Sequence, residues 1–181
     1  MEPLRLFDTS EPTLEFGTGL RARLRVIRGS HALLAQLPEL EPRSEPLGAL
    51  VLEAGLVTAT DLEWALEEAA GRRRRLGEVL LEEEFVSPDD LVRLLGEQRG
   101  MPYVDLSAFD PDPEALRLLP AATARLFRTL PVGFARGLPV VAVADPTDEL
   151  ALARARSFVD GARFVASSDR EILRRLEALG L

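Results

Sequence analysis

The sequence predicts an α+β protein: two stacked helical hairpins, then a small ββαβα unit, with a β-hairpin extension at the N-terminus. Leu47-Gly48 returns as Leu76-Gly77, an offset of 76 − 47 = 29 residues, and the apolar positions keep this offset as far as Gln98. From Met101 onward, short apolar runs typical of strands alternate with helical periodicity. The boundaries that follow are 1–37 for the extension, 38–46 for a linker, 47–100 for the repeated helical hairpins and 101–181 for the α+β unit.

Alternating apolar residues in the extension predict two strands. Residues 13–16 and 20–27 alternate on either side of the turn sequence Gly17-Thr18-Gly19, which is typical of a β-hairpin. Arginines at positions 21, 23 and 25 would share one strand face. Such a row fits either an anion or partner site, or a solvated edge strand that charge protects from aggregation. A short helix ending at Leu37 is expected next, and the proline-containing linker follows it.

Each copy of the repeat predicts a helix, a turn and a second helix. In the first copy, apolar residues recur at helical spacing from Leu47 to Ala54, and Gly55 follows where a helix ends with positive φ. In the second copy, Ser87 takes the N-cap position of the next helix and Pro88 its first helical position. A unit of this kind cannot bury its apolar face alone, so the two copies are expected to pack on each other.

These residues resemble the N-terminal domain of type II secretion and type IV pilus assembly ATPases, called MshEN where it binds cyclic di-GMP. In the second copy the matching residues are Arg75-Leu76-Gly77, Leu80-Leu81, Phe85-Val86, Leu91, Leu95 and Gln98. In the first copy they are Leu47-Gly48, Val51-Leu52, Gly55, Leu56-Val57, Leu62 and Leu66. The segments 101–106 and 143–148 are also similar, so the resemblance extends from Pro46 to the C-terminus.

The resemblance implies a site for cyclic di-GMP that both copies build. The residues it implies are Arg75, Leu76, Gly77, Leu91, Leu95, Gln98, Leu47, Gly48, Leu62 and Leu66. The leucine–glycine surfaces would hold the purines, Arg75 would hold guanine or phosphate, and Gln98 would close the far end. The chain departs from the family pattern at three positions, where Pro46 replaces Arg, Ala69 replaces Gln and Glu84 replaces Gly. We therefore expect weak binding, residing in the second copy.

In the α+β unit the apolar and helical patterns predict four strands and three helices. The strands are expected at 103–106, 129–134, 138–143 and 163–166, and the helices at 114–119, 149–159 and 170–179. Ser168 and Glu171 have the spacing of a capping box at the start of the last helix.

Composition excludes several kinds of chemistry. The chain has no cysteine, and all 22 of its Lys+Arg residues are arginine, so disulfides, a Walker-type phosphate loop and a Schiff-base lysine are impossible. One histidine makes neither a metal site nor a catalytic pair. The net charge of −8 argues against nucleic acid as a partner, and no apolar run is long enough for membrane insertion. We expect a cytoplasmic protein with no catalytic residues, no metal and no cofactor other than the cyclic dinucleotide named above.

Two features leave alternatives open. The run Arg72 to Arg75 is either a solvated hinge between the hairpins or an anion-recognition element. Trp64 points away from the apolar stripe of its helix, so it either packs under the N-terminal extension or forms part of a partner surface.

The three departures favour a docking module over a receptor. Because the chain ends at Leu181, before any ATPase domain, we expect a non-catalytic regulatory module that binds a protein of a secretion or pilus machine. The alternative is a cyclic di-GMP receptor domain with a degenerate first motif.

Overall fold

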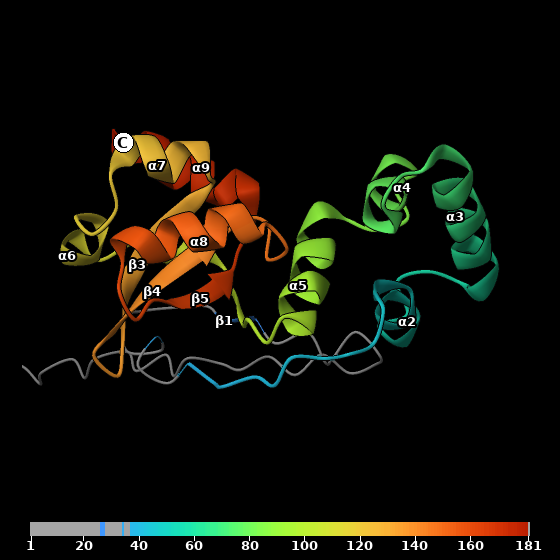
Figure 1. Cartoon of the computed structure of the whole chain (residues 1–181), viewed down its shortest axis with the longest axis horizontal. Coiled ribbons are helices and arrows are strands. Elements are labelled where there is room, and N and C mark those ends of the chain that lie inside the picture. Colours follow the sequence, from blue (N-terminus) through green and yellow to red (C-terminus); the bar gives the residue numbers. More distant parts are fainter. Residues whose placement is uncertain (1–25, 28–33, 35–36, 181) are drawn as a thin grey trace, which may run out of the picture.

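The computed structural model describes residues 26–27, 34 and 37–180. Helices and strands gather in two parts of the molecule (Figure 1). We call residues 47–100 the helical unit, and the five-stranded sheet with the helices that cover it the sheet unit. None of the helices in the described ranges is long and apolar enough to cross a membrane.

The helical unit consists of four helices that repeat at the expected offset. They are α2 (Leu47–Glu53), α3 (Ala59–Arg72), α4 (Leu76–Glu82) and α5 (Pro88–Gln98). Both longer helices begin at a side-chain cap: Thr58 forms a capping box with Asp61, and the Ser87 side chain accepts a hydrogen bond from the Asp90 N–H. Gly55 ends the first turn of the repeat with a φ of 65°, the left-handed conformation that a glycine adopts without strain.

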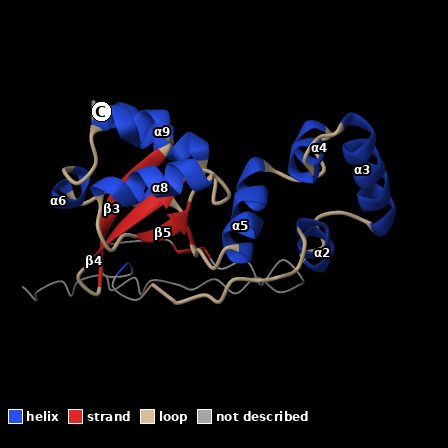
Figure 2. Cartoon of the chain, viewed as in Figure 1, coloured by secondary structure: helices blue, strands red, loops and turns tan. Residues whose placement is uncertain are grey.

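The sheet unit has one mixed sheet with the strand order β1-β2-β5-β4-β3. The strands are β1 (Val26–Ile27), β2 (Tyr103–Val104), β3 (Thr129–Ala135), β4 (Leu138–Val143) and β5 (Arg163–Ala166). Neighbouring strands pair in parallel, except for the antiparallel hairpin of β3 and β4. The helical segments of this unit are η2 (Leu106–Ala108), α6 (Pro113–Leu116), α7 (Ala121–Leu126), α8 (Glu149–Phe158) and α9 (Asp169–Ala178), which lie around the sheet in Figure 2.

Most elements lie where the sequence predicts them, and the differences are local. The helix expected at 114–119 is shorter, and α7, which was not predicted, follows Pro120. Ser168 occupies the N-cap position of α9 but makes no side-chain capping bond, so the predicted capping box is wrong. The Glu171 carboxylate is turned toward Arg174, from which one oxygen accepts a hydrogen bond at 3.0 Å, and its other oxygen has no hydrogen-bond partner in the described chain.

The predicted N-terminal hairpin lies mainly outside the described residues. The end of its second expected strand, Val26–Ile27, is described and pairs in parallel with β2 as the edge of the sheet. Leu34 is helical, and both Leu34 and Leu37 are buried in the core of the sheet unit.

The buried apolar residues of the described chain form one cluster in each unit. Helix α5 connects them, because one side of it packs in the helical cluster through Leu91 and Leu94, and the other side packs against β2 and β5. The approach is closest at Gly96, where an added Cβ would lie 2.8 Å from the Cβ of Ala166 and 2.9 Å from the Met101 carbonyl oxygen. Only glycine allows α5 to lie this close to the sheet.

The segment predicted as a linker has no regular structure but is held at both ends. Near the sheet, Arg136 pairs with Glu39 at 3.1 Å, and Arg163 donates a hydrogen bond to the Pro38 carbonyl at 3.4 Å. Near the helical unit, the Arg43 N–H donates to the Gln98 carbonyl at 3.0 Å. The segment therefore follows a defined path from the sheet to the start of α2.

We predict that Gly96→Ala lowers the free energy of unfolding by about 1–3 kcal/mol, because the new methyl group overpacks a backbone contact. Gly71→Ala, near the end of α3, is the matched control. An added Cβ there has no neighbour within 4 Å, so this variant should gain up to about 1 kcal/mol from the higher helix propensity of alanine. Urea unfolding followed by circular dichroism measures both, and a Gly96→Ala variant as stable as the wild type would contradict the close approach.

Candidate ligand-binding site

The two leucine–glycine pairs face each other across the helical unit. A Cβ added to Gly48 would lie 3.4 Å from a methyl group of Leu62 and 3.6 Å from one of Leu76. A Cβ added to Gly77 would lie 3.4 Å from a methyl group of Leu91 and 3.5 Å from one of Leu47. Each glycine thus contacts the leucine of its own copy's second helix and the first leucine of the other copy.

This reciprocal contact brings together six of the ten residues that the resemblance implies. The contacts join Leu47, Gly48, Leu62, Leu76, Gly77 and Leu91. Leu95 is half-buried against the helical cluster, whereas its counterpart Leu66 is 48% exposed on α3. The two copies therefore make the same contacts at the centre of the apolar site, but Leu66 and Leu95 differ in exposure at its edge.

The polar residues of the site lie at its two ends. The side-chain amide of Gln98 donates to the carbonyl of Glu45 at 2.7 Å, which places it beside Pro46, the N-cap residue of α2. At the other end, the Arg74 N–H donates to the Ala69 carbonyl at 2.9 Å, beside Arg75, the N-cap residue of α4. Each end thus combines the N-cap residue of one copy with the last helical turn of the other copy. The two family-type polar side chains therefore lie at opposite ends, one at each.

Arg75 is the more available of the two polar residues. It is exposed, and its guanidinium forms no ion pair or hydrogen bond with any other residue that the structure describes. Pro46 occupies the equivalent cap with nearly the same backbone, φ −67° and ψ 153° against −75° and 142°. The proline therefore preserves the backbone of the cap but supplies no donor for a ligand.

Glu84 has the left-handed backbone conformation that glycine has at the equivalent position of the first copy. Its φ is 55°, against 65° at Gly55, which lies 84 − 55 = 29 residues earlier. The side chain is exposed and forms no ion pair within the described ranges. A non-glycine residue in this region costs on the order of 1–2 kcal/mol, so the departure at Glu84 strains the turn without changing its path.

An ion-pair cluster also repeats at the 29-residue offset. Arg43 binds Glu53 at 2.6 Å and Glu97 at 3.4 Å. The equivalent residue, Arg72, contacts Glu82 at 3.8 Å and also pairs with Glu68. Glu53 and Glu82, and likewise Glu68 and Glu97, are 29 residues apart. Each cluster joins two copies, because its arginine binds one carboxylate from each.

The repeat therefore begins earlier than Leu47. The signal that could have revealed it is an arginine four residues before each Leu-Gly pair, at positions 43 and 72. Hydrogen bonds to Glu45 and Glu53 raise the pKa of Arg43 above its ordinary value, so this guanidinium stays charged and bound. In the run of four arginines, Arg72 and Arg74 are both occupied with glutamates, which supports the hinge interpretation for these two positions.

Trp64, the partner-surface candidate, is 42% exposed on α3. Its ring is perpendicular to that of Phe85, with the ring centroids 5.8 Å apart. Its counterpart on α5, Arg93, lies over the Tyr103 ring at 4.6 Å from the centroid. The same helix position is therefore packed on one copy and open on the other.

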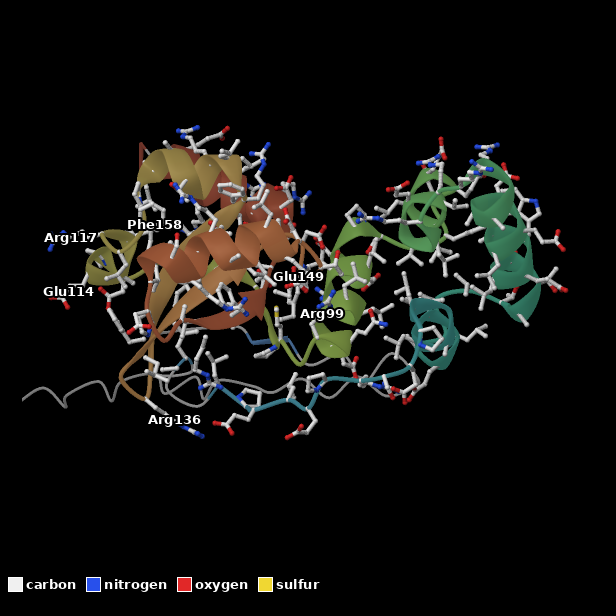
Figure 3. The ribbon with its side chains drawn as sticks, viewed as in Figure 1. Arg99, Glu114, Arg117, Arg136, Glu149 and Phe158 are labelled. Carbon is white, nitrogen blue, oxygen red and sulfur yellow. The ribbon has the colours of Figure 1, made fainter. Side chains whose placement is uncertain are left out.

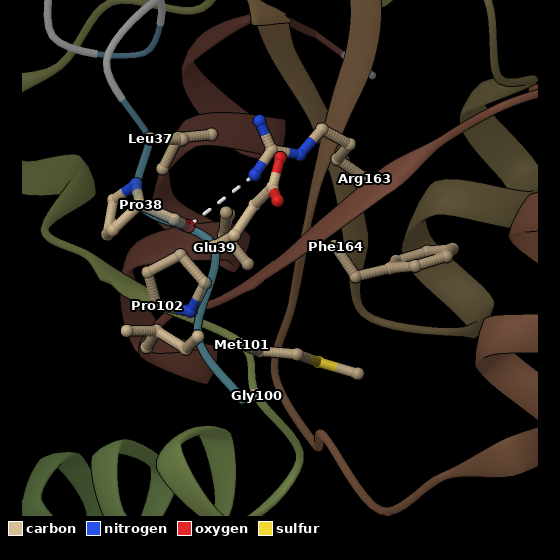
Figure 4. A pocket seen from close by; sticks show the side chains of 10 residues that line it. Leu37, Pro38, Glu39, Gly100, Met101, Pro102, Arg163 and Phe164 are labelled. Carbon is tan, nitrogen blue, oxygen red and sulfur yellow. Dashed lines mark hydrogen bonds between the residues drawn. The ribbon is translucent and has the colours of Figure 1, made fainter. Parts of the chain in front are cut away.

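The rest of the described chain has weaker candidates for a binding site. No group of three or more histidine, aspartate or glutamate residues in the described ranges could hold a metal ion. Asp112 caps α6, and Asp110 pairs with Arg175 at 2.8 Å, so both carboxylates already have partners. A pocket of about 240 Å³ lies between the linker, the turn after α5 and β5 (Figure 4). Its polar lining includes Arg163, which is already bonded to Pro38.

Comparison with known proteins identifies the class. A model of the MshEN domain matches residues 99–180. The solved structure of MshE with cyclic di-GMP is 31% identical, with a TM-score of 0.64, over 74% of this chain and 98% of that one. The N-terminal domain of XpsE, 24% identical with a TM-score of 0.55, covers 77% of this chain and 97% of that one, and shares the fold.

Two of the curated relatives are pilus assembly ATPases. The type IV pilus assembly ATPase PilB of Thermus thermophilus is 34% identical over 108 residues, and PilB of Myxococcus xanthus is 29% identical over 106. Each match includes 59% of this chain but only 12% and 19% of the respective ATPase, so the chain spans less than a fifth of either relative. The fold and the repeated site define an N-terminal domain of the pilus and secretion ATPase type. The chain belongs to the MshEN family of such domains.

We predict that Glu84→Gly raises the free energy of unfolding by about 1 kcal/mol, because glycine relieves the left-handed strain at some cost in unfolded-chain entropy. The neighbouring Glu83→Gly removes the same charge from a residue with a φ of −87°. That control should lose about 0.5–1 kcal/mol. Thermal and urea unfolding compare the two variants, and equal effects would show that the turn is not strained.

Proposed function

We propose that the chain is a non-catalytic regulatory module of the pilus and secretion ATPase type, and that it acts by docking on a protein partner. The observation that supports this most directly is the state of the candidate ligand site. Its apolar centre is intact, but Pro46 and Ala69 supply no side-chain hydrogen bonds, and the Gln98 amide is engaged with Glu45. Only Arg75 offers a free charged group among the site residues that the structure describes.

A second function, cyclic di-GMP binding, is favoured by a specific likeness. MshE was solved with this ligand, and its structure matches this chain at 31% identity. Gly48 and Gly77 lie among leucines of both copies, which form an apolar surface of the kind on which flat purines pack. Because each end of the site retains one family-type residue, a ligand that spans the site would meet one polar partner at each end.

The hydrogen bonds that the ligand site has lost favour docking over cyclic di-GMP binding. A hydrogen bond to a charged group contributes roughly 1.5–3 kcal/mol, and each 1.4 kcal/mol is a tenfold change in affinity. The loss of one arginine and one glutamine therefore weakens a micromolar site to about the millimolar range. A guanine edge or phosphate that is dehydrated without a new partner raises the cost further.

We predict that cyclic di-GMP binds the natural chain in about the millimolar range, as measured by isothermal titration calorimetry. Arg75→Ala should abolish the remaining binding. The double variant Pro46→Arg/Glu84→Gly should bind at least about tenfold more tightly, because it restores a guanidinium at a cap whose backbone already matches that of Arg75.

Arg73→Ala is the control, since it removes the same charge from an exposed residue two positions away. It should leave the affinity within about twofold of the natural chain, as expected for a solvated charge. Micromolar binding by the natural chain that Arg75→Ala removes would establish the receptor function in place of docking. Micromolar binding that Arg75→Ala leaves unchanged would place the site elsewhere.

A further inference from the structure

The two copies of the repeat expose the same helix face to different surroundings. On α5 the outer face packs against the sheet unit: Gly96 touches Ala166, Arg93 covers Tyr103, and Arg99 pairs with Glu149 at 2.6 Å. Figure 3 shows Arg99 and Glu149 directed toward each other where the two units meet. The outer face of α5 is thus an interface within the chain.

The corresponding residues of α3 are all exposed. They are Thr60, Glu63, Trp64, Glu67, Ala70 and Gly71, each 29 positions before a residue on or next to the outer face of α5. We call these six residues the α3 face. In Figure 1, α3 lies at the end of the helical unit farthest from the sheet, so the sheet unit does not cover this face. The Trp64 side chain is 42% exposed, and the ring of Phe85 packs perpendicular to it.

The α3 face carries an aromatic ring and acidic residues where the outer face of α5 carries a cation and small or apolar residues. Where α5 presents the cation of Arg93 to the ring of Tyr103, α3 presents the ring of Trp64. Where Val92 and Gly96 stand on α5, Glu63 and Glu67 stand on α3. Neither glutamate forms an ion pair with another residue in the described part of the chain. The face therefore combines an exposed aromatic ring with two unpaired carboxylates.

We infer that the α3 face binds a basic segment of a partner protein, with an arginine or lysine over Trp64 and further cations on Glu63 and Glu67. A cation placed on a tryptophan face and flanked by carboxylates gains from both interactions, and arginine can stack and form paired hydrogen bonds at once. This inference rests on the docking function proposed above and adds the place and the chemistry of the partner.

The test uses the full chain and a fluorescein-labelled amphipathic peptide of about 16 residues that carries arginine along one helical face. Its matched probe has glutamine in place of each arginine. Fluorescence anisotropy in about 150 mM salt, where distant exposed charges are screened, measures the affinities. Unlabelled peptide is used for intrinsic emission, which reports Trp64 because the chain has one tryptophan.

We predict that the arginine peptide binds at least about fivefold more tightly than the glutamine peptide and shifts or quenches the Trp64 emission. Glu63→Gln/Glu67→Gln should weaken binding by about tenfold, and Trp64→Ala by a similar factor. Glu114→Gln/Glu177→Gln removes two charges from exposed residues of α6 and α9 in the sheet unit, and should change the affinity by less than about twofold.

Three results would overturn the inference. Equal losses from the two double variants would mean that the peptide senses net charge, and an unchanged Trp64 emission on binding would place the contact elsewhere. A shift of the Trp64 emission when the protein alone is concentrated would assign the α3 face to a second copy. These results leave the docking function standing, whereas micromolar, Arg75-dependent binding of cyclic di-GMP would remove it.

Discussion

The architecture depends on one constraint: neither helical hairpin can bury its own apolar side. The two hairpins pack on each other at Gly48 and Gly77, where a leucine of the opposite copy lies against each glycine. A Cβ added to either glycine would meet these leucine methyl groups at 3.4–3.6 Å, in ordinary van der Waals contact, so the pairing depends on the leucines that the two copies share. The ion pairs of Arg43 and Arg72 act in the same direction, because each arginine binds one glutamate from either copy. The shared pattern of leucine, glycine, arginine and glutamate is thus explained by mutual packing before any ligand is considered.

Helix α5 adds a second constraint, because it has to serve two surfaces at once. Its inner side completes the helical cluster, and its outer side approaches the sheet so closely that Gly96 meets Ala166 directly. The linker follows a parallel route from Pro38 to the Gln98 carbonyl, so two separate segments connect the units. The second helix of the second copy therefore packs on two sides, whereas α3 packs on one.

Much of the helical unit could be predicted from the sequence because its rules are local. Cap residues, the glycine at position 55 and apolar spacing fixed four helix positions, and the strands at 129–134, 138–143 and 163–166 followed from apolar runs. The capping box predicted at Ser168 does not form, because spacing alone does not determine the direction of the Glu171 carboxylate, which is turned toward Arg174. The residues that meet at each end of the site could not be predicted either, since the contact of Gln98 with Glu45 joins residues 53 positions apart.

The repeat also explains how binding residues can change while the fold persists. Pro46 and Arg75 occupy caps with nearly the same backbone, and Glu84 follows the path of Gly55 at an energetic cost on the order of 1–2 kcal/mol. Trp64 and Arg93 share one helix position, yet one is exposed and the other packs on a ring. Side chains at such positions contribute little to the two buried clusters. Their identity therefore reflects what each copy contacts, and α3 of the first copy, which lies farthest from the sheet unit, leaves them exposed in the described part of the chain.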